Sequence, residues 1–208
     1  MSDLELMTAI KTKCGDLLTS SSNASSVPAA FLAALIANES GGNPDANRFE
    51  PAVFAALGEV LLGRKAAYGS IGKQDLLLFA LPAQISAPAQ GGLSSSGCAT
   101  LFGSALQRLA SLATSWGLTQ VMGYEAIAYR ILSDGVTALQ EPISEMNITT
   151  RMLADFGHRF QLDLTMPDDA TRSEFFDCWN SGRPHAPTAD PQYIPNGLAR
   201  FALYQGLA

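Results

Sequence analysis

The sequence predicts a mostly α-helical protein, organised as one domain over residues 1–208, with at most a small β-hairpin. Leucine, which favours helices, occurs 27 times, whereas the strand-favouring residues valine and isoleucine occur 5 and 9 times. Apolar residues recur at helical spacing, and no alternating strand pattern extends beyond a few residues. A chain of 208 residues can bury a core without disulfides or metals, and we expect a monomer.

The first 26 residues are expected to form an N-terminal helix followed by a polar connector. Met7, Ile10, Cys14 and Leu17 share one helix face, because they are spaced by three or four residues. Residues 19–26 are polar apart from one alanine, and we expect the helix to end before them.

A second helix is expected over residues 29–38, which are almost entirely apolar. Ser26 can cap its first turn, and Pro28 suits a helix start, where a missing N–H does no harm. Gly41, Gly42 and Pro44 then favour the end of the helix.

Helical patterns continue downstream, with one long interruption. Residues 58–104 are interpreted as an insertion-like segment, in which residues 86–97, rich in Ser, Ala, Pro, Gln and Gly, are expected to form a mobile loop. The sequence of residues 68–72 is compatible with one small hairpin. Further helices are expected over residues 50–62, 104–114, 124–132, 150–160 and 168–179, with a short terminal helix from Asn196.

Composition argues against several classes of protein. The net charge of −6 offers no basic surplus for nucleic acid. The longest apolar runs, residues 31–37 and 76–81, are too short to cross a bilayer, so we expect no membrane insertion. The acidic start lacks a recognisable export signal, and we expect synthesis in the cytoplasm. His158 and His185 form neither a triad nor a zinc spacing, and we expect no metal and no cofactor.

Glu39 is the most informative single residue. It follows Phe31 and Leu35 by eight and four positions, so it shares their apolar helix face. A carboxyl group at the end of a buried stripe loses hydration, and its pKa is expected to rise. A raised pKa would let Glu39 keep a proton near neutral pH and act as a general acid.

Two strings carry a family resemblance. Ala37-Asn38-Glu39-Ser40-Gly41-Gly42-Asn43-Pro44-Asp45-Ala46 resembles the catalytic signature of lytic transglycosylases and goose-type lysozymes, glycoside hydrolase family 23 and its relatives. Ser115-Trp116-Gly117-Leu118-Thr119-Gln120-Val121-Met122-Gly123 resembles the family's Gly-Leu-Met-Gln-Val-Met-Pro block, with Thr119 in place of Met and Gly123 in place of Pro.

Further strings follow in the family's order. Phe176-Asp177-Cys178-Trp179-Asn180-Ser181-Gly182 resembles Ala-Tyr-Asn-x-Gly, with Trp179 in place of Tyr. Asp190-Pro191-Gln192-Tyr193-Ile194 resembles the segment that brings a tyrosine to the acid. Arg48-Phe49-Glu50-Pro51-Ala52-Val53-Phe54 is similar to a bacterial and phage N-acetylmuramidase branch. These motifs span residues 37 to 194, which is most of the chain.

The resemblance implies a lysozyme-like domain with an active-site cleft that cleaves peptidoglycan, or a related glycan containing N-acetylglucosamine. Glu39 would protonate the glycosidic oxygen and later take the proton of the C6 hydroxyl, closing a 1,6-anhydro ring. Ser115, Gln120, Asn180 and Tyr193 would bind substrate. The Gln120 amide suits sugar hydroxyls and acetamido groups, since it offers donors and an acceptor.

Other functions stay open at this point. If Asp45 or Glu50 acted as a second carboxylate, the enzyme would be an inverting hydrolase of the lysozyme or chitinase kind. A non-catalytic glycan-binding module of the same fold is a further alternative. The protein is expected to act at the cell wall, and release of a phage or prophage type would bring it there.

Overall fold

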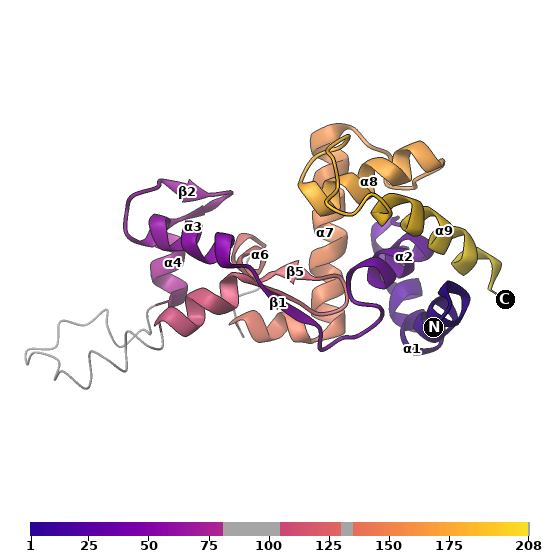
Figure 1. Cartoon of the computed structure of the whole chain (residues 1–208), viewed down its shortest axis with the longest axis horizontal. Helices are drawn as coiled ribbons and strands as arrows, with labels where there is room; N and C mark the ends of the chain where they lie inside the picture. The colour runs from indigo at the N-terminus through magenta and orange to yellow at the C-terminus, as the bar shows by residue number, and fades with distance from the viewer. Residues whose placement is uncertain (81–104, 130–134, 208) are drawn as a thin grey trace, which may run out of the picture. The chain divides into compact units, whose positions relative to one another are not determined.

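The computed structural model describes residues 1–80, 105–129 and 135–207, so the loop expected at residues 86–97 lies outside the described residues. The chain divides into two compact units. Unit 1 comprises Met1–Ala46, Gly117–Gln120 and Glu141–Ala208, and unit 2 comprises Asn47–Trp116 and Val121–Gln140. The elements are mostly helices, with a few short antiparallel strands, which confirms the predicted fold class (Figure 1).

The first helix of unit 1, α1, is longer than predicted and runs over Asp3–Ser25. It opens with a capping box, in which the Ser2 hydroxyl accepts from the Glu5 N–H and the Glu5 carboxylate accepts from the Ser2 N–H. The polar connector expected at residues 19–26 is therefore wrong. The helix continues through these residues from Leu18, which is fully buried, and the Ser25 hydroxyl donates to the Ser21 carbonyl one turn earlier. Ser26, predicted as a cap for the next helix, instead ends α1 in a left-handed conformation.

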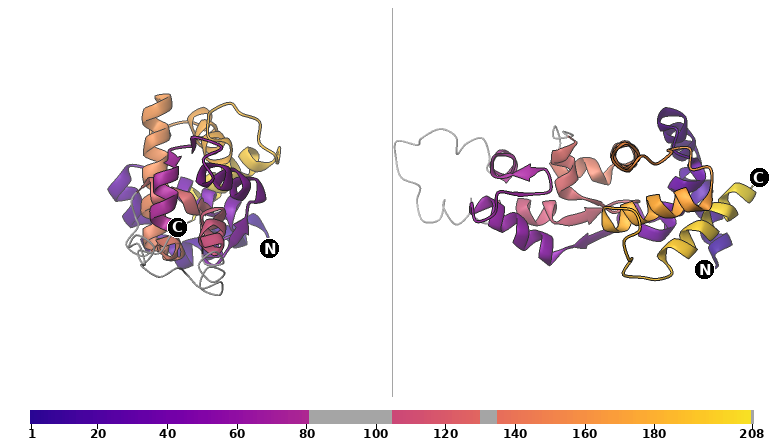
Figure 2. Two further views of the ribbon diagram at one scale, coloured as in Figure 1. Left: turned by 90° about the vertical axis from the view of Figure 1, so that its left-hand side faces the viewer. Right: turned by 90° about the horizontal axis from the view of Figure 1, so that it is seen from above.

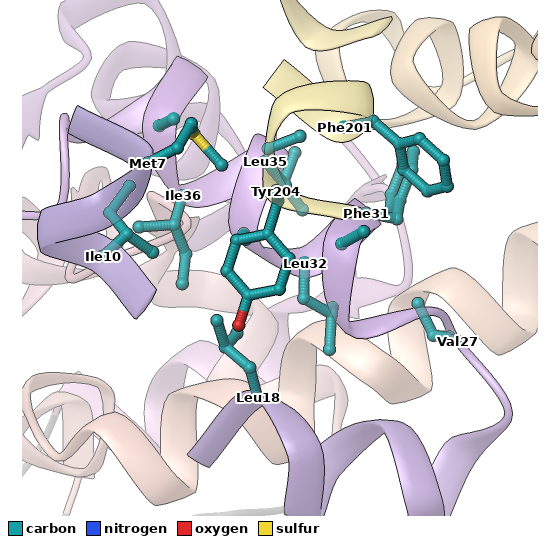
Figure 3. Packing of buried hydrophobic residues seen from close by; sticks show 14 of the residues in the cluster. Met7, Ile10, Leu18, Val27, Phe31, Leu32, Leu35, Ile36, Phe201 and Tyr204 are labelled. Carbon is teal, nitrogen blue, oxygen red and sulfur yellow. The ribbon is translucent and has the colours of Figure 1, made fainter. Parts of the chain in front are cut away.

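Helix α2, Ala29–Glu39, is the centre of the unit 1 core. All eight residues from Ala30 to Ala37 are buried, as expected for a helix that is apolar on every side. Figure 3 shows Leu32, Leu35 and Ile36 of α2 among side chains of α1 and α9, Tyr193–Gly206. Burial of residues 30–37 places the last residue of the helix, Glu39, at the edge of the core.

Two further helices, α7 and α8, pack against each other in unit 1. Helix α7, Pro142–Phe160, begins eight residues before the predicted start at residue 150, and Pro142 occupies its first turn. Helix α8, Asp169–Ser181, starts where expected, because the Asp168 side chain accepts from the Thr171 N–H at 2.8 Å. Phe31 of α2 packs against the Phe176 ring of α8, with ring centroids 4.5 Å apart.

Helix α9 begins at Tyr193, three residues before the predicted start at Asn196. Figures 1 and 2 show α9 running beside α8. The close approach depends on Gly197, since a Cβ there would lie 2.6 Å from the Phe176 ring. The earlier start places Tyr193 in the first turn of α9.

Unit 2 contains two small antiparallel sheets. The predicted hairpin is formed by β2 and β3, which pair Ala67 with Gly72 and Tyr68 with Ile71. A three-stranded sheet of order β1-β4-β5 is an addition to the prediction, because strands of two or three residues show no alternation in sequence. The elements are β1 Asn47–Phe49, α3 Pro51–Leu61, β2 Ala67–Tyr68, β3 Ile71–Gly72, α4 Lys73–Ala80, helical residues 105–112, β4 Thr114–Trp116, β5 Val121–Met122, α6 Gly123–Ala128 and the 3₁₀ helix η2 Gly135–Gln140.

No helix among the described residues combines the length and apolar character that a membrane crossing requires. The expected insertion-like segment, residues 58–104, falls within unit 2, which begins earlier, at Asn47.

Candidate active site

The centre of the candidate site is a contact between Glu39 and Tyr193. The Tyr193 hydroxyl donates a short hydrogen bond to Oε1 of the Glu39 carboxylate. Tyr193 is only 8% exposed, and burial, followed by the charge and hydrogen bond of Glu39, raises the pKa of its hydroxyl well above the ordinary value. The tyrosine therefore stays protonated and remains a donor. Two residues 154 positions apart thus meet where α2 ends and α9 begins.

A tight turn, residues Gly117–Gln120, packs against the end of α2. The Ser40 hydroxyl, directly after Glu39, donates to the Leu118 carbonyl at 2.7 Å. The Gly117 N–H donates to the Ala46 carbonyl at 2.8 Å. The first two motifs of the family resemblance are therefore joined by hydrogen bonds within unit 1.

Gln120 helps to shape this turn. Its φ of 56° is left-handed, and its amide Nε2 donates to the carbonyls of Gly117 at 2.9 Å and Ala46 at 3.1 Å. Both amide hydrogens are thus directed at backbone oxygens of the site itself. A role for Gln120 in binding sugar stays a prediction.

Glu145 is a residue of the site that sequence reasoning missed. It lies on α7, is 1% exposed, and accepts from the N–H of Leu118 at 2.8 Å, the N–H of Thr119 at 2.6 Å and the Thr119 hydroxyl at 2.8 Å. The Thr149 hydroxyl contacts that of Thr119 at 2.7 Å. Pro142 could have signalled that α7 begins early enough to include Glu145, because proline is frequent in a first helical turn.

The Glu145 carboxylate also explains the glycine at the head of the turn. Gly117 has a φ of +78°, and a Cβ there would lie 2.2 Å from Glu145 Oε2. Burial raises the pKa of the Glu145 carboxyl group to about 7, against the opposing effect of the hydrogen bonds from Thr119 and Leu118. Gly123 also has a local cause, since a Cβ there would lie 2.2 Å from the Ser111 carbonyl oxygen.

The third motif reaches the turn through its aromatic residue. Trp179, on α8, donates from Nε1 to the Thr119 carbonyl at 3.2 Å. Asp177 is buried and accepts from the His185 N–H at 2.9 Å, which shapes the chain beyond α8. Asn180 is exposed, and the Ser181 hydroxyl lies 3.4 Å from its Oδ1. Binding of sugar by Asn180 stays a prediction.

The other predicted site residues fall in different places. Asp45 belongs to unit 1, is exposed, and its N–H donates to Asn43 Oδ1 at 3.0 Å. Ser115 and Glu50 belong to unit 2. Ser115 is buried in β4, and Glu50 precedes the first turn of α3, where its carboxylate pairs with Arg48 Nε at 2.6 Å. A second carboxylate for the reaction therefore stays a prediction.

Within residues 1–80, 105–129 and 135–207, no three His, Cys, Asp or Glu side chains are grouped in a way that could hold a metal ion. Comparisons with family models, with curated proteins and with solved structures found no match to this chain.

Proposed function

We propose that this protein cleaves the β-1,4 bond between N-acetylmuramic acid and N-acetylglucosamine in peptidoglycan, with Glu39 as general acid and then general base. One observation carries the proposal: the separate motifs that resemble the lytic transglycosylase family are joined by hydrogen bonds in one compact unit. Ser40 contacts Leu118, Trp179 contacts Thr119, and Tyr193 contacts Glu39.

The chemistry needs a carboxyl group that changes its protonation during the reaction. Glu39 donates its proton to the glycosidic oxygen as the bond between that oxygen and C1 of the muramic acid breaks. The substrate's acetamido group can stabilise the cation. The C6 hydroxyl oxygen then bonds to C1, and its proton returns to the Glu39 carboxylate, which leaves a 1,6-anhydro ring and a restored acid.

The Tyr193 hydroxyl has a defined part in this cycle. A hydrogen bond to a carboxylate favours its ionised form, so Tyr193 stabilises Glu39 in the stage between the two proton transfers. Because the pKa of the Tyr193 hydroxyl is raised well above its ordinary value, the tyrosine does not compete with Glu39 for the role of proton carrier.

Digestion of purified peptidoglycan, followed by mass spectrometry of the soluble fragments, tests the proposal. We expect muropeptides that end in 1,6-anhydromuramic acid. Chitin oligosaccharides, incubated in parallel, test the related substrate that lacks muramic acid. If folded protein released no fragment from either polymer, the proposal would be wrong and a non-catalytic glycan-binding role would become the better reading.

A further inference from the structure

A chain of hydrogen bonds leads from Glu39 through α9 to the start of α1. The Asn38 amide nitrogen donates to the Tyr193 carbonyl oxygen at 2.9 Å, and the Asn38 amide oxygen accepts from Arg200 Nη1 at 2.7 Å. Arg200 Nε and Nη2 both lie 2.9 Å from Asp3 Oδ1. Partners on α9 thus engage both ends of the Asn38 amide, which fixes its orientation.

Arg200 can join these partners because its guanidinium group is a planar fork of donors. One edge of the fork contacts Asp3 on α1, and the remaining nitrogen reaches Asn38 on α2. The Arg200 side chain is 17% exposed and that of Asp3 is 42% exposed, so water competes more for the bonds to Asp3 than for the part-buried bond to Asn38. A lysine at this position carries one compact ammonium group and lacks the fork that serves both partners together.

Asn38 connects this chain of hydrogen bonds to the Glu39–Tyr193 contact. Asn38 directly precedes Glu39, and the carbonyl that it holds belongs to the same residue whose hydroxyl contacts Glu39. We infer that Arg200 and Asn38 are positioning residues that hold the Tyr193 hydroxyl on the Glu39 carboxylate and thereby set the pH at which Glu39 releases its proton. The inference rests on the proposed function, in which Glu39 carries the proton.

The titratable and charged groups that these contacts bring together lie on three helices. They are Asp3 on α1, Glu39 on α2, and Tyr193 and Arg200 on α9. A donor to an ionised carboxylate favours the charged form, so loss of the Tyr193 hydroxyl should let Glu39 keep its proton to a higher pH. Tyr193→Phe should move this titration upward by about one pH unit.

Arg200→Lys and Asn38→Ala should move the titration of Glu39 in the same direction by a smaller amount. Each variant weakens the positioning of the Tyr193 hydroxyl without removing that hydroxyl. Arg172→Lys is a matched control. Arg172 lies on α8 in the same unit, its side chain is 15% exposed, and it pairs with Asp169 at 2.5 Å. Its guanidinium also lies 4.2 Å from the Phe201 ring centroid of α9. The control therefore weakens a comparable arginine contact to α9 that does not lead to Asn38.

Nuclear magnetic resonance of protein labelled with ¹³C-carboxyl glutamate tests the inference without substrate. The Glu39 signal is assigned by its absence in Glu39→Gln, and the fold of each variant is checked by thermal melting. We expect upward shifts in Tyr193→Phe, Arg200→Lys and Asn38→Ala, and none in Arg172→Lys. The alkaline limit of muropeptide release should move by the same amounts.

Two results would overturn the inference. One is a folded Arg200→Lys or Asn38→Ala protein in which Glu39 titrates as in the wild type. The other is an equal shift in Arg172→Lys, which would mean that any weakening of α9 has the effect. If the titration shifts as expected but the wild type cleaves no peptidoglycan, the positioning role stands and the proposed function fails, so the two failures are distinguishable.

Discussion

At Gly117, two independent constraints act on a single residue. Its φ of +78° is left-handed, a conformation that costs residues with a side chain about 1–2 kcal/mol. In addition, the Glu145 carboxylate occupies the space that a Cβ would need. The glycine is therefore required both by the turn and by the buried carboxylate behind it.

Gly117→Ala should lower the free energy of unfolding by roughly 3 kcal/mol or more, because backbone strain is added to the displacement of a buried, hydrogen-bonded carboxylate. Gly182→Ala is a matched control, since Gly182 has a similar φ of +75° and nothing within 4 Å of a Cβ. It should show the backbone strain alone. Chemical denaturation of both variants measures the difference in their free energies of unfolding. Equal losses would contradict the expected clash between a Cβ at residue 117 and the Glu145 carboxylate.

The Gly117–Gln120 turn and α7 depend on each other through Glu145. In the unfolded chain this carboxyl group titrates near its ordinary pKa of 4.5, whereas in the folded protein burial raises the pKa to about 7. Between these values the folded protein binds a proton that the unfolded chain has released. The contribution of Glu145 to stability is therefore fully present below pH 4.5 and is lost as pH rises through about 7.

We accordingly expect the free energy of unfolding to fall by up to about 3 kcal/mol between pH 4.5 and pH 8, and Glu145→Gln to remove most of this dependence. Urea denaturation at several pH values measures it. Asp163 and Asp168 titrate below this window, because hydrogen bonds from Thr165 and Thr171 lower the pKa of their carboxyl groups. An unchanged pH dependence in Glu145→Gln would show that another group is responsible.

Helices with a clear apolar pattern could be predicted from sequence, and elements that depend on tertiary contacts could not. Helix α2 was predicted within a residue, because a wholly apolar run is followed by two glycines. The last turns of α1 are polar, and they continue the helix from Leu18, whose complete burial is a tertiary contact that the sequence pattern does not show. The strands β1, β4 and β5 are too short for any periodicity to identify them.

The candidate site was predictable where its residues lie in motifs, and not where they depend on tertiary contacts. The family resemblance pointed to Glu39, Tyr193 and the Gly117–Gln120 turn, and hydrogen bonds within unit 1 connect Glu39 to Tyr193 and the adjacent Ser40 to the turn. It did not identify Glu145, because a single carboxylate outside any motif becomes informative only when its partners in space are known. Nor could it show that the Gln120 amide donates to backbone carbonyls of its own site.

At the scale of the whole molecule, the chemistry of the product separates the proposed function from its alternatives. We expect 1,6-anhydromuramyl ends that take up no oxygen from water enriched in ¹⁸O, because the C6 hydroxyl of the substrate acts in place of water. Mass spectrometry of the fragments measures the incorporation of ¹⁸O directly. Full uptake of ¹⁸O at the muramic acid end would instead indicate a hydrolase. Loss of that hydrolysis in Glu50→Gln or Asp45→Asn would then identify the second carboxylate.

The proposed reaction depends above all on Glu39 as the carrier of the proton. Glu39→Gln keeps the size of the side chain but removes the exchangeable proton, so muropeptide release should fall by about three powers of ten or more while the melting temperature stays near that of the wild type. Glu141→Gln is the matched control, because Glu141 is an exposed glutamate of the same unit whose side chain makes no capping hydrogen bond to α7. The decisive measurement is the rate of muropeptide release by the two folded variants. We expect a loss in Glu39→Gln alone, and near-normal release by folded Glu39→Gln would show that Glu39 does not carry the proton.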